Sequence, residues 1–286
     1  MQSLTNPQYI KSLMKKHGVR FSKGLGQNFI VNPDVCPEMA FLSGSGEGVG
    51  ALEIGPGVGV LTRELALSCE KVACVEIDPS LLPVLAETMA PFPNVEVIRG
   101  DVLKTDLHAL IGERFPGLDV IVCANLPYYI TSPILMHLLE SRLPVKSITV
   151  MVQKEAAQRI CVPLPSRQAG AITAAVHYYS VPRLLFPVAK ESFLPPPKVD
   201  SAVIRLDVRS QPAVAVNQEA LLFRIIRGAF AQRRKTIHNS LAAALSMDKS
   251  AVAGLLAGAG VSLTARPEAL SLEEFAAIAN AAETGG

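Results

Sequence analysis

The sequence has few cysteines and no pairing pattern among them. Five cysteines are spread over 286 residues, and none forms a Cys-x-x-Cys pair. An odd number of unpaired cysteines argues against a disulfide framework and against a zinc ribbon. We therefore expect reduced thiols, a cytoplasmic location and no metal site.

Long apolar runs are also absent. No run reaches the roughly 18 residues that span a bilayer, and the N-terminus lacks the continuous apolar stretch of a signal peptide. We therefore expect no membrane association. Hydrophobic residues at 49% and charged residues at 18% exclude a disordered chain. The length predicts one large domain or two unequal ones.

Acidic residues are missing from two segments, 1–23 and 224–235, each of which contains five Lys or Arg residues. The rest of the chain has 17 basic and 25 acidic residues, a net charge of −8 that the overall +2 conceals. Concentrated cations on an acidic body are typical of polyanion-binding proteins, because Lys and Arg contact phosphates. Ordinary solvated surface charge is the alternative.

Short apolar runs alternate with helical patterns from residue 49 onward. Five runs rich in Val and Ile indicate buried strands at 49–54, 71–77, 95–98, 119–125 and 147–153. This alternation predicts an α/β fold with a parallel sheet. Two later runs, 172–180 and 201–208, could extend the sheet.

Strand patterns stop after residue 208, and residues 209–218 indicate a linker. We therefore predict an α/β domain over 1–208, including the basic N-terminal segment, and a helical domain over 209–286. Within the latter, the pattern predicts a helix over 219–241, a glycine-terminated helix over 249–260 and a capping box before 275–282.

The helix predicted over 219–241 would carry one basic stripe opposite its apolar face. The stripe contains Arg224, Arg227, Arg234, Lys235 and His238. The neighbouring arginine at position 233 falls on the apolar side. Either the helix breaks near position 232 or this arginine has a buried partner.

Gly55, Gly57 and Gly59 follow the first predicted strand and open a helix. Glycines in this place let the backbone approach a ligand and aim helix N-terminal amides at it. The G-x-G-x-G spacing differs from the full dinucleotide motif, and tight turns also need glycine. Glu76 lies 21 residues after Gly55, where a carboxylate can accept both ribose hydroxyls, and Asp101 is placed to accept an exocyclic purine amine. Together they predict a nucleoside-containing ligand at the carboxyl edge of the sheet.

Asn125, Leu126, Pro127 and Tyr128 stand at the end of the fourth predicted strand. An exocyclic adenine amine is a poor nucleophile because its lone pair is delocalised into the ring, so an alkylating enzyme must hold both N–H groups on acceptors. The side-chain oxygen of Asn125 and the carbonyl of Leu126 would supply two. Pro127 would stiffen the turn, and Tyr128 would offer an aromatic face to an unstacked base. With a sulfonium methyl as electrophile, catalysis would be mostly positioning and electrostatics.

The glycine loop, the two acids that follow it and the tetrapeptide resemble the class I S-adenosylmethionine-dependent methyltransferases of the rRNA adenine N6 dimethylating family. Residues 24–30 are similar to that family's G-Q-N-F-L element, with Ile30 in place of the commoner leucine. Residues 192–201 and 230–235 also match, so the resemblance spans nearly the whole chain. These last two elements favour the kasugamycin-sensitivity type. That type dimethylates two adjacent adenosines in a hairpin loop near the 3′ end of small-subunit (16S) rRNA.

The resemblance implies a Rossmann-like methyltransferase domain, a small all-α RNA-binding domain, and S-adenosylmethionine as cofactor with S-adenosylhomocysteine as product. It implies cofactor contacts from Gln27, Asn28, Ile30, Gly55, Gly57, Glu76, Asp101 and Asn125. It implies contact with the target adenine from the tetrapeptide 125–128 and from Phe193 on the face opposite Tyr128, although Phe193 could equally be a core residue. RNA phosphates would be held by Lys15, Lys16, Arg20, Lys23, Arg224, Arg227, Arg234 and Lys235.

Three other functions stay open at this point. The macrolide-resistance enzymes that methylate large-subunit (23S) rRNA have similar cofactor motifs. An NAD-dependent oxidoreductase would use the same glycine loop but leaves the tetrapeptide and the basic segments unexplained. A non-catalytic ribosome-assembly factor would not need the tetrapeptide. We expect a monomer that acts on rRNA, within a partly assembled small subunit.

Overall fold

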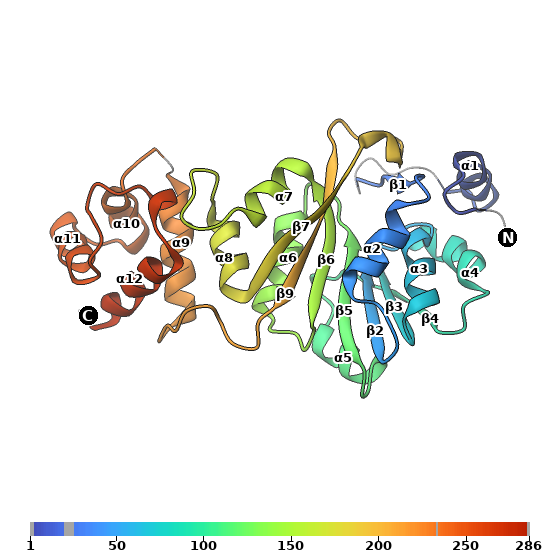
Figure 1. The fold of residues 1–286 in the computed structure, drawn as a ribbon, viewed down its shortest axis with the longest axis horizontal. Helices are drawn as coiled ribbons and strands as arrows, with labels where there is room; N and C mark the ends of the chain where they lie inside the picture. Colours follow the sequence, from blue (N-terminus) through green and yellow to red (C-terminus); the bar gives the residue numbers. More distant parts are fainter. Residues whose placement is uncertain (1–2, 20–25, 233, 285–286) are drawn as a thin grey trace. The chain divides into compact units, whose positions relative to one another are not determined.

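The computed structural model describes residues 3–19, 26–232 and 234–284 of the chain (Figure 1). The chain forms two compact units. The first contains residues 1–157 and 183–208, and the second contains 158–182 and 209–286. The predicted limit after residue 208 coincides with one change of unit. Residues 158–182, which we assigned to the first domain, pack with the second unit instead.

A seven-stranded sheet with the order β4-β3-β2-β5-β6-β9-β7 is the framework of the first unit. Neighbouring strands from β4 to β6 are parallel, and β9 is antiparallel to β6. All five predicted strands are confirmed, as is the strand over 201–208, but β4 is only partly buried and not buried as predicted. The strands are β2 (Val49–Ile54), β3 (Lys71–Glu76), β4 (Val95–Arg99), β5 (Asp119–Asn125), β6 (Ser147–Gln153), β7 (Ser180–Val188) and β9 (Ser201–Val208).

The strand order reverses between β2 and β5, because the chain runs outward to β4 and then returns. In doubly wound sheets, ligands bind at such a switch point, at the carboxyl ends of the strands. Both the glycine loop, which follows β2, and the tetrapeptide, which begins at the end of β5, stand at this point. The topology therefore brings together motifs that lie about 70 residues apart in the sequence.

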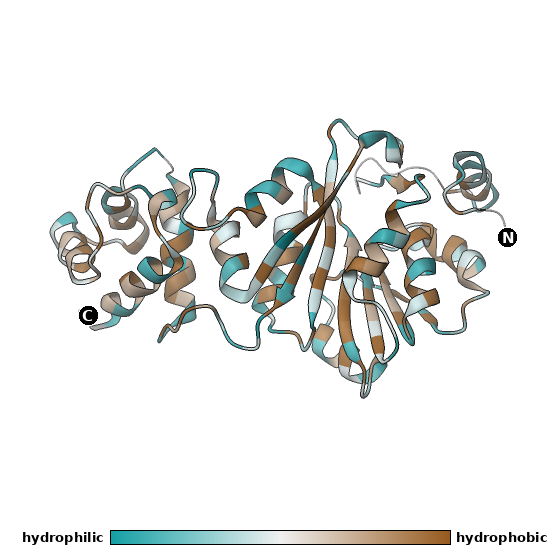
Figure 2. Ribbon diagram, in the orientation of Figure 1, coloured by the Kyte–Doolittle hydropathy of each residue, from teal (hydrophilic) through white to brown (hydrophobic). Residues whose placement is uncertain are grey.

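Helices cover both faces of the sheet. One face carries a core in which residues of α1, α2, α3 and α4 pack on alternate strand residues such as Ala51, Cys74 and Ile121. The opposite strand positions, including Leu52, are also buried, as are most of the large apolar residues of α5 and α6. Figure 2 shows how strongly apolar residues concentrate on the central strands. The helices are α1 (Pro7–Lys16), α2 (Val35–Ser43), α3 (Val60–Ser68), η1 (Pro79–Leu81), α4 (Leu82–Met89), α5 (Leu107–Arg114) and α6 (Thr131–Glu140).

A second, two-stranded sheet fixes the segment that precedes α2. In it β1 (Phe29–Ile30) pairs antiparallel with β8 (Phe193–Leu194), so Ile30 lies opposite Phe193. A short helix, η2 (Lys190–Ser192), leads into β8. The resemblance linked both segments to one site, and the pairing does bring them together.

The second unit contains helices from two parts of the chain. These are α8 (Ala171–Tyr179), α9 (Glu219–Ala231), α10 (Ile237–Leu245), α11 (Lys249–Gly258), η3 (Pro267–Ala269) and α12 (Leu272–Thr284). The chain passes between units through α7 (Lys154–Cys161) and through β7. The predicted capping box is confirmed, since Ser271 N donates to Glu274 Oε2 at 2.7 Å and Glu274 N to Ser271 Oγ at 3.2 Å.

Two expectations for the second unit were wrong. Residues 172–180 do not add a strand to the sheet, because all but the last belong to α8. The helix predicted over 219–241 ends at Ala231, and a new helix begins at Ile237. The break near position 232 was one of the two alternatives, and it removes the single basic stripe. Position 233 itself lies outside the described residues.

Within the described part of the chain, no single helix is long and apolar enough to cross a membrane. The pair α10 and α11, bent by 117° at its break, passes that test by length and composition alone.

Candidate active site

The switch point of the sheet opens into a cavity of ≈ 820 Å³, including space open to solvent. Its walls contain most of the predicted cofactor and catalytic residues, from segments far apart in the chain. They include Gln27, Asn28, Ile30, Gly55, Gly57, Glu76, Asn125, Leu126, Pro127 and Tyr128.

The glycine loop forms one wall of this cavity. Gly55 and Gly57 have φ values of +68° and +62°, in the left-handed region that L side chains rarely adopt. A Cβ on Gly57 would lie 3.2 Å from Cε1 of Phe29, so the loop also passes closely beneath the 26–30 segment. A Cβ on Gly55 would meet no atom within 4 Å, so this is where the backbone leaves room for a ligand, and the predicted cofactor contact stays a prediction. Helix α3 begins directly after the loop.

Two buried carboxylates face the cavity at the ends of adjacent strands. Glu76 ends β3, and burial raises the pKa of its carboxyl despite hydrogen bonds from the backbone of Asp78, Gly57 and Ile77. Glu53 lies in β2 and is 2% exposed, and burial raises its pKa from 4.5 to about 7. Glu53 stands two residues before Gly55, but the sequence pattern alone indicated no role for it. Both groups place acceptors, and at higher pH negative charge, beside the cavity.

A second cavity adjoins the first, with Gly55, Ile77 and Pro127 in the walls of both. Its lining is mostly apolar and contains Asp101. Asp101 therefore lines the second cavity rather than the first, together with Gly55, which lines both. An apolar slot with one carboxylate suits a purine ring with an exocyclic amine, which is the role the sequence predicted for this acid. Ile77 is 52% exposed, although it is a large apolar residue between the two cavities.

The tetrapeptide is held in place by hydrogen bonds from other elements. Asn125 Nδ2 donates to the carbonyl oxygen of Asn28 at 3.2 Å, which turns the side-chain oxygen away from that partner. The hydroxyl groups of Tyr128 and Ser201 are 2.7 Å apart and share a hydrogen bond. Burial raises the pKa of Tyr128. Both side chains thus reach the cavity with fixed orientations.

Phe193 occupies a core position. It is 3% exposed, pairs with Ile30 across the β1–β8 ladder and belongs to the apolar cluster on that face of the sheet. It is not among the described residues that line the first cavity. Its predicted contact with a target base thus stays a prediction, and its packing role is the one visible in the structure.

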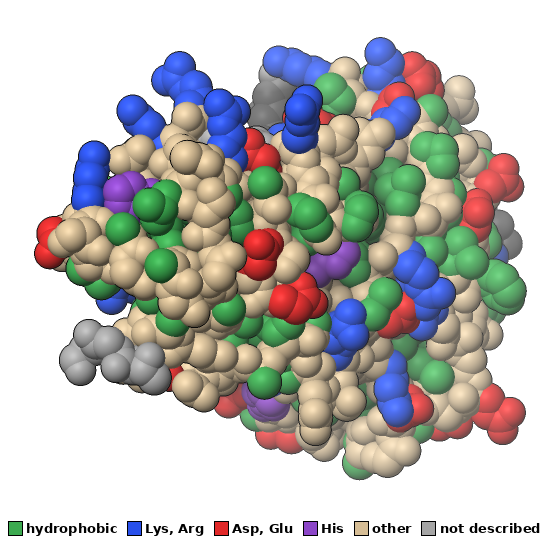
Figure 3. Space-filling view, turned by 60° about the vertical axis from the view of Figure 1, so that its left-hand side comes forward, with side chains coloured by type: hydrophobic (Ala, Val, Ile, Leu, Met, Phe, Trp, Pro, Cys, Tyr) green, Lys and Arg blue, Asp and Glu red, His purple; other side chains and the backbone are tan. Residues whose placement is uncertain are grey.

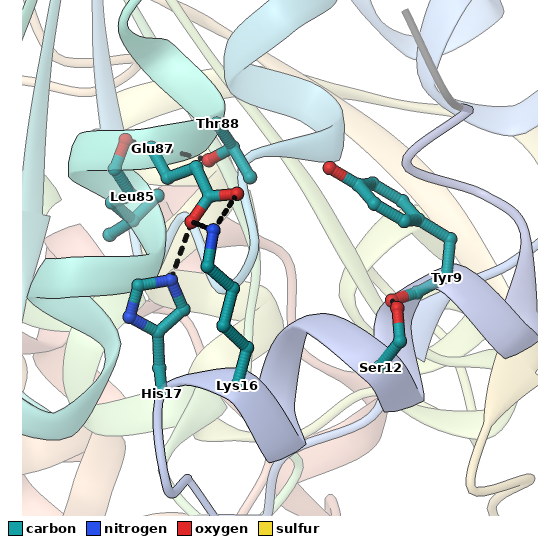
Figure 4. A network of polar contacts seen from close by, with 7 residues as sticks. All are labelled: Tyr9, Ser12, Lys16, His17, Leu85, Glu87 and Thr88. Atoms are coloured by element: carbon teal, nitrogen blue, oxygen red, sulfur yellow. Dashed lines mark hydrogen bonds and ion pairs between the residues drawn. The ribbon is translucent and has the colours of Figure 1, made fainter.

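The N-terminal basic residues that were predicted to bind RNA differ from one another in their surroundings. Lys16 Nζ lies 2.7 Å from Glu87 Oε2 of α4, and His17 Nε2 lies at the same distance from that oxygen (Figure 4). These contacts anchor the end of α1, and they lower the pKa of Glu87. Lys15 is exposed. The predictions for Arg20 and Lys23 fall outside the described residues.

The second unit is the more basic of the two. It contains ten Lys and Arg residues against six Asp and Glu, a net of +4, whereas the first unit has a net of −2. Arg224, Arg227, Arg234 and Lys235 are all exposed. Arg224 also donates to the carbonyl oxygens of Ala244 and Leu245 at the end of α10. Figure 3 shows several Lys and Arg side chains projecting together along the upper left of the face in view.

Two residues that position the site were given no role of their own by the sequence analysis. Ser201 orients Tyr128 from β9, and Asp78 receives a hydrogen bond from Gln27 at 2.7 Å. Each partner is more than 50 residues away, so only the fold reveals the pair. No group of three or more His, Cys, Asp or Glu residues that could hold a metal occurs among residues 3–19, 26–232 and 234–284.

Comparisons with known proteins agree with this geometry. The ribosomal RNA small subunit methyltransferase A of Alkaliphilus oremlandii is 44% identical over 281 residues, which are 98% of each chain. The solved 23S rRNA methyltransferase ErmE is 26% identical, with 90% of this chain and 100% of that chain covered and a TM-score of 0.66. A dimethyladenosine transferase from Plasmodium falciparum shares the fold, with 24% identity, 87% and 95% coverage and a TM-score of 0.72.

These structural neighbours are methyltransferases, which confirms the predicted Rossmann-like methyltransferase fold. Residues 18–283 match the family described as ribosomal RNA adenine dimethylase. This match covers more than nine-tenths of the chain and includes the glycine loop, both acids and the tetrapeptide. The protein therefore belongs to the ribosomal RNA adenine dimethylase family.

Proposed function

We propose that this protein transfers methyl groups from S-adenosylmethionine to N6 of two adjacent adenosines in a 3′-terminal hairpin loop of small-subunit rRNA, giving N6,N6-dimethyladenosine. The observation that carries the proposal is the cavity in which the tetrapeptide 125–128 meets the glycine loop and Glu76. The small-subunit target rests on the relative at 44% identity, which is named for that subunit.

The residues around the two cavities fit the cofactor. The open space beside Gly55 gives room for close approach, Glu76 offers acceptors for ribose hydroxyls, and Asp101 offers one for the purine amine. When bound, S-adenosylmethionine supplies a methyl group on a sulfonium, so transfer needs no covalent intermediate with the protein. The buried carboxyl groups of Glu53 and Glu76 place acceptors near that cation and, where they are ionised, negative charge.

Asn125 prepares the target amine for attack. Because its amide nitrogen is bonded to Asn28, its side-chain oxygen is the atom that can accept an N–H of the adenine amine, together with the backbone carbonyl of Leu126. Holding both N–H groups on acceptors leaves the nitrogen lone pair directed at the methyl group. Each methyl group that N6 gains from the bound cofactor would replace one N6 proton, which would pass to solvent.

Tyr128 supplies a wall for the flipped adenine. Its hydroxyl is fixed by Ser201, so the ring is ordered before a base arrives and loses little entropy on stacking. In this proposal the exposed basic residues of the second unit and of the N-terminal segment bind RNA phosphates, which gives affinity and register. We further propose that the enzyme acts as a monomer in the cytoplasm on a partly assembled small subunit.

The test is Asn125→Ala, measured in three assays. We expect loss of methyl transfer to N6, RNA binding within a few-fold of wild type, and retained binding of S-adenosylhomocysteine, since Asn125 is one of many cavity residues. Full transfer activity in this variant would refute the role of Asn125. Binding of NAD, but not S-adenosylhomocysteine, by the wild-type protein would refute the proposed chemistry as a whole.

A further inference from the structure

Asp78 stands at a junction of hydrogen bonds beside the cofactor cavity. It is 8% exposed, and each of its carboxylate oxygens accepts from a different element. Oδ2 accepts from Gln27 Nε2 at 2.7 Å, whereas Oδ1 accepts from the backbone N and the hydroxyl of Ser80 at 2.9 and 2.6 Å. The carboxylate is thus tied both to the N-terminal segment and to η1.

The same residue also orients the carboxylate proposed to bind ribose. The backbone N–H of Asp78 donates to Glu76 Oε1 at 2.7 Å, two residues back at the end of β3. This bond fixes one oxygen of Glu76 against the main chain. A continuous chain of bonds therefore joins Gln27, Asp78 and Glu76, although Gln27 and Asp78 are 51 positions apart in the sequence.

The N-terminal segment is held at a second point on the far side of the cavity. There the carbonyl oxygen of Asn28 accepts from Asn125 Nδ2 at 3.2 Å. Consecutive residues, Gln27 and Asn28, are thus bonded to the ends of β3 and β5, and both line the cavity. Residues 26–30, which we call the strap, are therefore held by these two bonds in addition to the pairing of Phe29 and Ile30 with β8.

The carboxylate of Asp78 is better suited to holding residues 26–30 in place than to contacting a ligand. Burial alone would raise its pKa, but the hydrogen bonds from Ser80 and Gln27 outweigh burial and hold the pKa below its ordinary value. The group is therefore charged, and a hydrogen bond to a charged acceptor is stronger than a neutral one. Asp78 is also not among the described residues that line the first cavity.

We propose that Asp78 is a positioning residue for cofactor binding, which fastens the 26–30 strap through Gln27 and aligns Glu76 through its own backbone. The inference rests on the proposed cofactor site and changes one detail of it. Gln27 acts through Asp78, so its contribution to cofactor affinity depends on the charge of that partner. A residue that only touched the cofactor would show no such dependence.

Exchanging the two functional groups tests this dependence. Gln27→Glu places two carboxylates at the 2.7 Å contact and should break it, whereas Gln27→Glu combined with Asp78→Asn restores an amide–carboxylate pair with reversed polarity. The asparagine oxygen can still accept from Ser80. Gln8→Glu, a change at an exposed position of α1, is the matched control for added negative charge.

The measurement is the Kd for S-adenosylhomocysteine by calorimetry, with Tm recorded for each variant. We expect Gln27→Glu to weaken binding about ten-fold with little change in Tm, the double variant to return within about two-fold of wild type, and Gln8→Glu to bind normally. Unchanged affinity in Gln27→Glu would overturn the proposal, and so would a double variant no better than Gln27→Glu. Failure of the wild-type protein to bind would instead contradict the proposed function.

Discussion

Glu53 should make the stability of the protein depend on pH in a way that one substitution removes. Its carboxyl is buried in β2, and its folded-state pKa is about 7 against an ordinary value of 4.5. Below about pH 4.5 the carboxyl is protonated in both the folded and the unfolded chain, so the raised pKa does not change the free energy of unfolding. As pH rises from about 4.5 to about 7, the unfolded chain loses this proton while the folded chain keeps it, and the free energy of unfolding falls progressively.

The size of the effect follows from the shift. A difference of about 2.5 pKa units corresponds to about 3 kcal/mol of destabilisation above pH 7, at about 1.4 kcal/mol per unit. Glu53→Gln keeps the size of the side chain and cannot ionise. We therefore expect the substitution to raise the free energy of unfolding by up to about 3 kcal/mol at pH 8 and by little or nothing at pH 4.5 or below.

The assay is urea unfolding of both proteins at several pH values without cofactor. Glu47→Gln, at an exposed position, is the control, and it should leave the difference from wild type flat with pH. A Glu53→Gln difference that does not grow between pH 4.5 and 8 would refute the assignment of a buried, proton-binding carboxyl at this position.

Three further changes test the packing, the cofactor loop and the RNA surface. Gly228→Ala would place a Cβ 2.2 Å from that of Ala244, so α9 and α10 must separate. We expect urea unfolding to show a free energy of unfolding lower by about 1–3 kcal/mol, and unchanged stability would contradict this packing. Gly57→Ala puts a side chain at φ +62°, and calorimetry should show S-adenosylhomocysteine bound about ten-fold more weakly. Wild-type affinity would argue against a role of the glycine loop in cofactor binding. Arg234→Glu with Lys235→Glu should weaken RNA binding and make its salt dependence less steep, and an unchanged slope would place the RNA on another surface.

The sequence predicted the framework because its signals are local. The runs at 49–54 and 119–125 are apolar, β-branched and too short for buried helices, so strand was the consistent interpretation. The run at 172–180 has a similar composition but forms α8, whose residues Thr173–Val176 are all buried. A helix buried on every side has no amphipathic period, and therefore cannot be told from a buried strand by pattern.

The site was predictable where motif residues carry their own chemistry. The glycine loop, Glu76 and Asn125 needed only the rule that parallel strands present their carboxyl ends at one edge. Partners such as Asp78 for Gln27 could not be predicted, because no local rule pairs residues that far apart. For Phe193 the sequence left a substrate contact and a core position equally open; the fold shows the core position, and the contact with a target base stays a prediction.

Methyl transfer to isolated ribosomal subunits tests the central proposal most directly. Undermethylated small and large subunits would be incubated with the protein and labelled S-adenosylmethionine, and the modified nucleosides identified by mass spectrometry. We predict label in small subunits alone, as N6,N6-dimethyladenosine at two adjacent positions near the 3′ end. Label in the large subunit alone, or no N6-methylated adenosine in either, would contradict the proposed function.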